Sequence, residues 1–251
     1  MELDRGTDVE FNEPHSVAES LAEAFRPRPA APGFHRRPME RTNALALPAW
    51  FIDSCRRAYL SVPFAEDGNR IVGVTSAQYG EGKTSVALGI ATALAADTRE
   101  PTLVMECDME RPSVADFLGI PEGPGLSDWL SEAAPLRVLQ LAPLDNAFIL
   151  PAGNRTTDGA RLIYRLSESE VIAELRPRFR NIVLDLPPLL NIAYSSLACK
   201  LAEHILLVAR YGQTSMADVQ KSAHLLGRER LTGVVLNGHA SKVPGWIRRL
   251  L

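Results

Sequence analysis

The feature that most constrains the fold is a glycine-containing loop between a β-branched strand and a helix of small residues. The loop is residues 76–85 (SAQYGEGKTS), the strand is 70–75 (RIVGVT), and the helix is expected from about 84 to 95. Such a loop binds phosphate because its backbone N–H groups, and those of the helix N-terminus, point toward an anion. The sequence therefore predicts a site for a nucleoside phosphate.

The loop residues have separate physical roles. Gly80 and Gly82 permit backbone conformations and close approaches that a side chain would prevent. Lys83 is expected to neutralise the terminal phosphates, and the Thr84 hydroxyl to bind Mg²⁺. The strict motif has glycine where this chain has Ala77, so a coincidental glycine-rich turn is the alternative. The loop residues predicted to bind the nucleotide are Gly80, Glu81, Gly82, Lys83, Thr84 and Ser85.

Apolar runs that alternate with helical segments predict the architecture. Strands are expected at 70–76, 102–107, 138–142, 148–151, 181–185, 202–209 and 231–237. Helices are expected at about 49–60, 84–95, 114–118, 126–130, 158–166, 168–177, 192–200 and 215–227. This alternation is typical of an α/β fold with a doubly wound, mostly parallel sheet and helices on both faces.

The chain divides into a leader, 1–47, and a phosphate-loop domain, 48–251. With 251 residues and 46% hydrophobic content, it can bury one substantial core. Within the leader, 1–13 is polar and acidic, 15–25 has the pattern of a short amphipathic helix, and 26–38 is basic and proline-rich. We expect disorder there; the leader is either a solvated extension or a docking segment for a partner.

Charge and cysteine content narrow the cellular setting. The net charge of -3 gives no global attraction for nucleic acid or an anionic membrane, so no nucleic-acid partner is expected. The 3 cysteines are widely spaced, as free thiols in a reducing compartment would be. No apolar run approaches the ~20 residues that span a bilayer, so neither a transmembrane segment nor a secretory signal is expected. These features predict a cytoplasmic protein.

Acidic residues follow two of the expected strands directly. Glu106 and Asp108 come directly after the apolar run 103–105, and Asp185 comes directly after the apolar run 182–184. The carboxyl ends of parallel strands meet the ligand in a doubly wound sheet, so these side chains are candidates for binding Mg²⁺ and positioning a reacting group. For Glu106, an ion pair with Arg111 is the alternative.

An ordered set of motifs resembles a known family. The motifs are 80–84 (GEGKT), 106–112 (ECDMERP), 125–128 (GLSD), 150–153 (LPAG), 184–188 (LDLPP) and 235–237 (VLN). Over about 49–240 the chain resembles the bacterial tyrosine kinases (BY-kinases) of capsule and exopolysaccharide synthesis. That resemblance implies a P-loop NTPase fold related to the MinD/ParA ATPases.

The resemblance also implies a chemistry, with ATP and Mg²⁺ as cofactors and a tyrosine hydroxyl as phosphoryl acceptor. It implies catalytic roles for Lys83, Asp108 and Asp185, with Asp108 receiving the hydroxyl proton. Asn237 would contact the adenine, or else simply end its strand as a turn residue. The implied metal ligands are Thr84, Glu106, Asp108 and Asp185. Implied partners are a membrane polysaccharide co-polymerase, which would hold the chain at the inner face of the membrane, and a homo-oligomer.

Departures from the family pattern favour a second function. The family usually has two aspartates and then arginine, whereas the slots here are Glu106, Asp108 and Glu110, with Arg111 one place later. The family also tends to end in a tyrosine-rich tail, and this chain has no tyrosine after Tyr211. A nucleotide-switched regulatory partner without kinase activity is therefore an alternative.

Three further segments bear on assembly and on a third function. The helix before the first strand keeps Asp53 and Arg56 of a family contact pattern but has Tyr59 in the next arginine slot, so ring-like assembly or plain surface charge remain open. Residues 243–251 (VPGWIRRLL) form an apolar and basic end that could contact a membrane, fit a partner groove or fold back. A MinD/ParA-like ATPase is the third reading, although such proteins carry an early loop lysine where this chain has Gln78.

Overall fold

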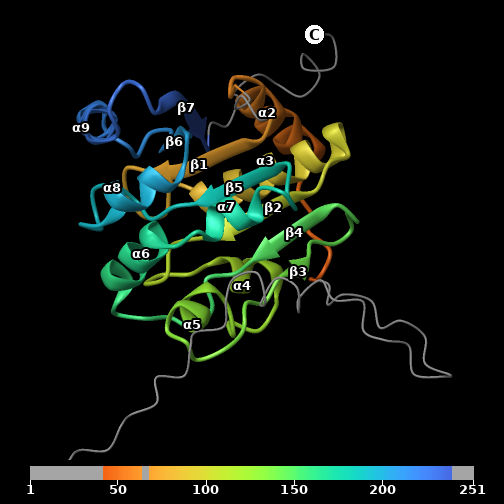
Figure 1. Cartoon of the computed structure of the whole chain (residues 1–251). Helices are drawn as coiled ribbons and strands as arrows, with labels where there is room; N and C mark the ends of the chain where they lie inside the picture. The colour runs from red at the N-terminus through yellow and green to blue at the C-terminus, as the bar shows by residue number, and fades with distance from the viewer. Residues whose placement is uncertain (1–41, 64–67, 239–251) are drawn as a thin grey trace, which may run out of the picture.

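A computed structural model describes residues 42–63 and 68–238 of the chain (Figure 1). The leader before 42 and the expected contact segment at 243–251 lie outside the described residues. The helices are α2 (Ala49–Leu60), α3 (Lys83–Thr98), α4 (Val114–Leu118), α5 (Leu126–Leu130), α6 (Gly159–Glu168), α7 (Val171–Leu175), α8 (Ser195–Ala198), the 3₁₀ turn η1 (Cys199–Leu201) and α9 (Met216–Leu226). The strands are β1 (Arg70–Ser76), β2 (Thr102–Glu106), β3 (Leu139–Gln140), β4 (Ala147–Leu150), β5 (Asn181–Asp185), β6 (His204–Arg210) and β7 (Leu231–Asn237).

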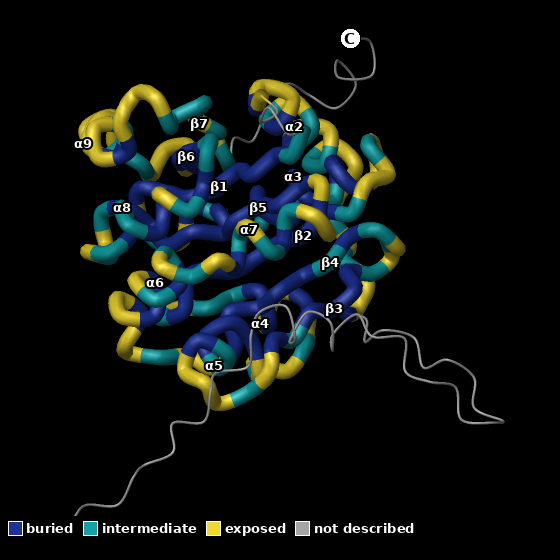
Figure 2. The backbone as a smooth tube through the Cα atoms, in the orientation of Figure 1, coloured by how far each residue is buried: buried dark blue, intermediate teal, exposed yellow. Residues whose placement is uncertain are grey.

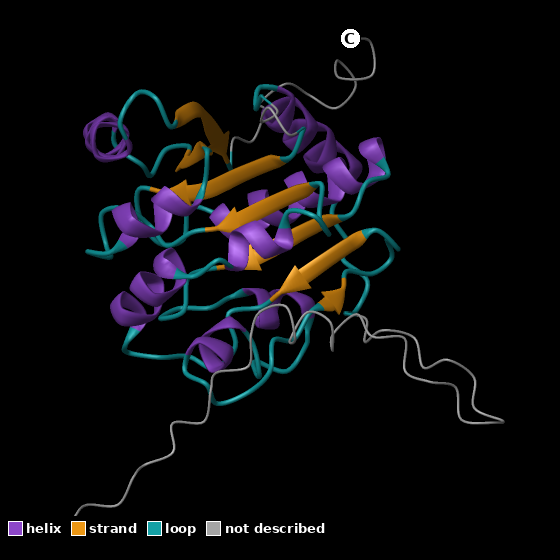
Figure 3. Ribbon diagram, viewed as in Figure 1, coloured by secondary structure: helices purple, strands orange, loops and turns teal. Residues whose placement is uncertain are grey.

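The strands form one 7-stranded sheet in the order β3-β4-β2-β5-β1-β6-β7. All neighbouring pairs are parallel except β3 and β4, which are antiparallel. Figure 3 shows β1, β5, β2 and β4 side by side with their arrowheads at the same edge. The expected doubly wound, mostly parallel α/β fold is confirmed.

Both faces of the sheet are covered, and each covering layer has its own apolar core. Side chains from α2, α3 and α4 form the core on one face, whereas α5 to α9 contribute to the core on the other. The central strands β1, β2 and β5 are buried at every position, as expected of parallel strands between two helical layers. Figure 2 shows this buried centre, with exposed residues concentrated on outer helices such as α9.

Small residues in α3 allow α2 to approach it closely. A Cβ built on Gly89 would lie 2.5 Å from the Cys55 sulfur and 2.9 Å from the ring of Phe51, so only glycine fits this crossing. The three cysteines, Cys55, Cys107 and Cys199, are free, as expected, and all three are buried.

Several helices and strands begin or end at other residues than expected. The strand expected at 138–142 is reduced to Leu139–Gln140, because this short edge strand pairs only with β4. The helix expected at 192–200 is limited to α8 and the following 3₁₀ turn. The helix expected at 84–95 begins at Lys83 and continues to Thr98.

Residues 42–47, which were expected to belong to the leader, lie against the domain. The N–H of Thr42 donates to the carbonyl of Gln140 at 3.0 Å, and the N–H of Leu45 donates to that of Ala142 at 3.1 Å. These bonds join residues 42–47 to the domain that was expected to begin at 48. No helix within 42–63 and 68–238 has both the length and the apolar character to cross a membrane.

Candidate nucleotide-binding and catalytic site

The phosphate loop, residues 76–82, connects the end of β1 to the start of α3. Gly82 has φ +91°, and a Cβ there would lie 2.2 Å from the Asn237 amide nitrogen, so both conformation and space require glycine. Gly80 also has a positive φ, +80°, but has open space around its Cα. The first backbone N–H groups of α3 have no helical partner, which suits an anion at this end of the helix.

Lys83 lies between two carboxylates at the carboxyl ends of neighbouring strands. Its Nζ is 3.1 Å from Oδ2 of Asp108 and 3.3 Å from Oδ1 of Asp185. The Thr84 hydroxyl donates to Oδ2 of Asp185 at 2.7 Å, and its oxygen is 2.9 Å from the Ser113 hydroxyl. The structure thus brings together Lys83, Thr84, Asp108 and Asp185, as the sequence predicted.

Burial and charge act in opposite directions on this cluster. Burial disfavours the Lys83 ammonium, but the charges of Asp185 and Asp108 outweigh it, and the pKa of Lys83 is raised. Burial raises the pKa of Asp185, although Lys83 and the Thr84 hydroxyl oppose that shift. The lysine therefore stays charged and serves as the cation that holds the two acids.

Glu106, the last residue of β2, lies in register with Asp185 of β5, but its carboxylate has different hydrogen-bond partners. Its Oε1 accepts from the N–H groups of Ser113 and Val114 at 2.6 and 2.9 Å, and its Oε2 accepts from that of Ala152 at 3.0 Å. Burial, with a contribution from Asp185, raises the pKa of Glu106 to about 7 against these bonds. The structure does not bring Glu106 to the lysine, and its metal role stays a prediction.

The chemistry of this donor set suits a divalent cation that has few protein ligands. Two buried carboxylates, of Asp108 and Asp185, flank Lys83, the buried Glu106 lies beside Asp185 on the neighbouring strand, and the Thr84 hydroxyl bonds Asp185. Among the described residues, no three acidic, histidine or cysteine side chains form a complete cage for a metal ion. Mg²⁺ typically binds one or two carboxylates together with substrate phosphates and water, which fits this arrangement.

The other side of the loop is held by a residue after β6 and by the last residue of β7. Glu81 is buried, and its carboxylate accepts from the Gln78 N–H at 2.9 Å and from the Thr214 hydroxyl. Asn237 donates to the Glu81 carbonyl at 2.9 Å, which places the predicted adenine contact beside the loop. Ser85 lies in the first turn of α3.

Sequence reasoning missed two of these loop contacts. Arg210 Nη1 donates to the Gly80 carbonyl at 2.8 Å, and Thr214 bonds Glu81. Arg210 ends β6, so the same rule that singled out the acids at strand ends could have found it.

An aromatic and basic pair flanks the acidic side. The Arg111 guanidinium lies 4.4 Å from the centre of the Tyr79 ring, and the Arg111 N–H donates to Asp108 at 3.2 Å. Burial, then the Asp108 charge, raises the pKa of the Tyr79 phenol to about 12. Arg111 therefore contacts Tyr79 and not Glu106, and the sequence did not reveal that pairing.

The charged residues of α2 are engaged within their own chain. Arg56 donates to Asp97 through Nε at 2.6 Å and Nη2 at 2.9 Å, and it also pairs with Asp53. The Tyr59 hydroxyl donates to the same Asp97 carboxylate at 2.6 Å. Tyr59 therefore contributes a hydrogen bond to the contact between α2 and α3.

The amino-acid sequence has relatives among curated proteins, although no protein-family model matches it. It is 29% identical over 211 residues to the putative tyrosine-protein kinase AmsA of Erwinia amylovora, covering 82% of this chain and 29% of the relative. It is 26% identical over 211 residues to the succinoglycan biosynthesis transport protein ExoP of Rhizobium meliloti, covering 80% and 27%. The chain therefore spans less than a third of these two relatives.

Solved structures support the same grouping. The VpsO kinase domain has a TM-score of 0.66 and 28% identity, covering 76% of this chain and 97% of that one. MinD of Pyrococcus horikoshii, solved with Mg-ADP, has a TM-score of 0.57 and 23% identity, covering 72% and 76%. The second likeness shows the fold alone. Together with the lysine and acid geometry above, these comparisons show a P-loop NTPase fold and support the resemblance of this chain to the bacterial tyrosine kinases (BY-kinases).

Proposed function

We propose that this chain binds MgATP at the phosphate loop and transfers the γ-phosphoryl group to a tyrosine hydroxyl, and so regulates exopolysaccharide or capsule synthesis. The observation that carries the proposal is Lys83, held between Asp108 and Asp185 while Thr84 bonds Asp185. This arrangement combines a phosphate-binding cation, a metal-binding acid and hydroxyl, and a second acid within one buried cluster. Those are the components that phosphoryl transfer requires.

Nucleotide binding requires Lys83 to exchange partners. In the structure its ammonium compensates Asp108 and Asp185. When phosphates occupy the loop, Lys83 and the N–H groups of the loop and of α3 bind them. Asp185 and Thr84 are then the groups that would hold Mg²⁺, which neutralises charge that develops on the phosphates.

We assign to Asp108 the role of general base for the acceptor tyrosine. Its carboxylate takes the proton of the tyrosine hydroxyl as that oxygen forms a bond to the γ-phosphorus. The bond between the γ-phosphorus and the bridging oxygen breaks, and ADP leaves. Catalysis then depends on alignment and charge neutralisation, because the protein forms no covalent intermediate.

The test is phosphotyrosine formation by the full chain with Mg-[γ-³²P]ATP and a random copolymer of glutamate and tyrosine. We expect incorporation that Lys83→Met abolishes and Asp108→Asn lowers by roughly 10²–10⁴-fold, the usual contribution of a general base. Lys200→Met is the matched control, since Lys200 is exposed and distant from the loop in sequence. Absence of phosphotyrosine in the wild-type chain, despite bound ATP, would refute the kinase assignment.

A nucleotide-switched regulatory function without kinase activity is the second candidate. It is favoured by Glu106, whose two oxygens already accept three backbone N–H bonds and so serve the loop structure. ATP binding that changes partner affinity, with no phosphotyrosine, would support it. A MinD/ParA-like ATPase would instead show ATP turnover that DNA or lipid stimulates; the early loop position there is Gln78, which donates to Asp218 at 3.1 Å.

We further propose a membrane polysaccharide co-polymerase as partner, with the chain held at the inner face of the membrane by that contact. The name of the relative ExoP, a biosynthesis transport protein, supports this partner class. Co-purification of the full chain with such a membrane protein tests the assignment, and sedimentation with and without MgATP tests a homo-oligomer. The division of the chain into a leader and an ATP-binding domain is part of the same proposal, with residues 42–47, which were first assigned to the leader, now counted with the domain.

A further inference from the structure

Two consecutive backbone carbonyls of the phosphate loop are bonded to the ends of β6 and β7. Arg210 Nη1 donates to the Gly80 carbonyl at 2.8 Å, and Asn237 Nδ2 donates to the Glu81 carbonyl at 2.9 Å. Arg210 is the last residue of β6, and Asn237 is the last residue of β7. Both carbonyls therefore face side chains that these two strands supply.

A carbonyl that is held in this way also fixes the N–H group of the next residue. In a planar trans peptide the C=O and the following N–H point in opposite directions, and both of these peptide bonds are trans. The bond from Arg210 therefore turns the Glu81 N–H away from the arginine. The bond from Asn237 likewise turns the Gly82 N–H away from the asparagine.

The two amides that precede this part of the loop are already engaged. The Gln78 N–H donates to the Glu81 carboxylate at 2.9 Å, and the Tyr79 N–H donates to Oδ1 of Asn191 at 3.0 Å. The backbone donors that serve a phosphate therefore begin after Tyr79, and the N–H groups of Glu81 and Gly82 are among them, next to the start of α3. Their orientation decides how many donors an anion meets.

Both side-chain donors are held by their own neighbours. Oδ1 of Asn237 accepts from the Gly238 N–H at 2.9 Å, which orients the side-chain amide so that Nδ2 faces the loop. A Cβ on Gly82 would lie 2.2 Å from this Nδ2, so the approach is close. The backbone N–H of Arg210 donates to the Thr214 hydroxyl at 2.7 Å, within the turn that follows β6. The protein itself therefore fixes the two donors.

We propose that Arg210 and Asn237 are positioning residues that orient the Glu81 and Gly82 N–H groups toward the phosphates of the nucleotide. They act through the loop backbone, so Asn237 affects the binding of the triphosphate rather than of the adenine. A loop that is oriented in advance binds more tightly, because less ordering remains to be done on binding. This inference rests on the proposed nucleotide site, and it does not depend on phosphoryl transfer to tyrosine.

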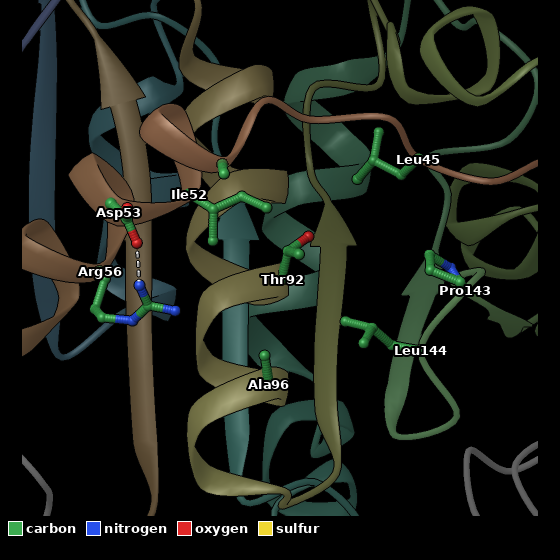
Figure 4. A pocket seen from close by; sticks show the side chains of 9 residues that line it. Leu45, Ile52, Asp53, Arg56, Thr92, Ala96, Pro143 and Leu144 are labelled. Carbon is green, nitrogen blue, oxygen red and sulfur yellow. Dashed lines mark hydrogen bonds and ion pairs between the residues drawn. The ribbon is translucent and has the colours of Figure 1, made fainter. Parts of the chain in front are cut away.

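Inorganic tripolyphosphate is the probe, because it has a chain of three phosphates as ATP does and has no nucleobase. The pocket of about 400 Å³ between α2 and α3 does not suit this polyanion. Apolar residues such as Leu45 and Leu144 line it, and its Arg56 is paired with Asp53 (Figure 4). Binding of tripolyphosphate therefore reports on the phosphate loop.

Isothermal titration of the full chain with MgATP and with magnesium tripolyphosphate measures the effect of Asn237. Asn237→Ala should weaken the binding of both ligands by roughly three- to tenfold, the loss expected from one hydrogen bond. Asn43→Ala removes the same kind of bond, from a side-chain amide to the Gly119 carbonyl, and should change neither affinity. A loss of ATP affinity alone would indicate an adenine contact and overturn the assignment of Asn237.

The Arg210 variant needs a control for charge. Arg210→Met should also weaken both ligands by roughly three- to tenfold. The loss should persist at about 0.5 M KCl, where the screening length is roughly 4 Å. Arg228→Met removes an exposed arginine outside the phosphate loop and is the charge-matched control. A loss that disappears at high salt, or that Arg228→Met reproduces, would overturn the orienting role of Arg210.

NMR of isotope-labelled protein follows the two N–H groups themselves. Tripolyphosphate should move the amide proton resonances of Glu81 and Gly82 downfield, because both donate to phosphate oxygens. Asn237→Ala should reduce the shift of Gly82 more than that of Glu81. Arg210→Met should do the reverse, which a general loss of stability would not produce.

Equal reductions of the two shifts, or none, would refute the orienting role while leaving the nucleotide site intact. A wild-type chain that binds neither MgATP nor tripolyphosphate would refute the nucleotide site itself, and this inference with it.

Discussion

Replacing Lys83 by methionine should lower the stability of the nucleotide-free domain as well as prevent nucleotide binding. The lysine side chain is 8% exposed, and those of its partners Asp108 and Asp185 are 1% and 0% exposed. Removal of one member of a buried pair leaves an uncompensated charge and costs about 3–5 kcal/mol. We expect about 3 kcal/mol here, because Thr84 and the Arg111 N–H still bond the two acids.

For a domain of this size, that loss corresponds to a melting temperature lower by about 6–12 °C. Differential scanning calorimetry of nucleotide-free protein at pH 8 measures it, with Lys200→Met as the charge-matched control. The double variant Lys83→Met with Asp108→Asn should recover part of the loss, since it removes one of the two unpaired charges.

The loss of stability in Lys83→Met should also depend on pH. Burial raises the pKa of Asp185, and removal of Lys83 raises it further, because the lysine opposes that shift. For an acid with a raised folded pKa, the ionised form costs stability at high pH, and the cost disappears as protonation occurs at lower pH. The difference between wild type and Lys83→Met should therefore shrink from pH 8 to pH 5. A melting temperature unchanged at pH 8, or a pH-independent difference, would refute this electrostatic account.

Three further variants test the loop, Glu106 and the metal. Gly82→Ala should cost about 1–3 kcal/mol and weaken ATP binding in calorimetry, since its φ is +91° and its Cβ would meet Asn237; Gly212→Ala, at positive φ with open space, should cost strain alone and leave ATP affinity intact. Wild-type stability should fall as pH rises from about 4.5 to about 7 through the raised pKa of Glu106, and Glu106→Gln should flatten that slope in urea titrations. A slope for Glu106→Gln equal to that of wild type would contradict the raised pKa of Glu106. Thr84→Val should weaken ATP binding with Mg²⁺ present and leave it unchanged in EDTA; equal loss in both would exclude a metal role for the hydroxyl.

Sequence patterns predicted most of the fold because the main elements have strong local signals. The strands at 70–76, 181–185 and 231–237 were correct to the residue, since buried parallel strands are continuous apolar runs with clear ends. The strand expected at 138–142 was too long. Val138, Leu139 and Leu141 pack into the core, but only Leu139 and Gln140 pair with β4.

The sequence identified the residues of the site more completely than it predicted the contacts that they make. Lys83, Asp108 and Asp185 were singled out together because strand ends converge in a doubly wound sheet. Glu106 met the same criterion, yet its carboxylate bonds three backbone amides from two loops. The conformation of those loops has no short-range signal, so that role could not be read from the motif.

The sequence by itself determined the phosphate loop, the strand and helix order, and the acids that follow β2 and β5. Those properties depend on local periodicity and on spacing between neighbours in the chain. Only the tertiary structure decided which partner each charged group has: Lys83 with both aspartates, Arg111 on Tyr79, and Arg56 on Asp97. These pairings join segments tens of residues apart in the chain. Several partners are possible for each charged side chain from the sequence alone, and the packing of the two helical layers against the sheet determines which of them it contacts.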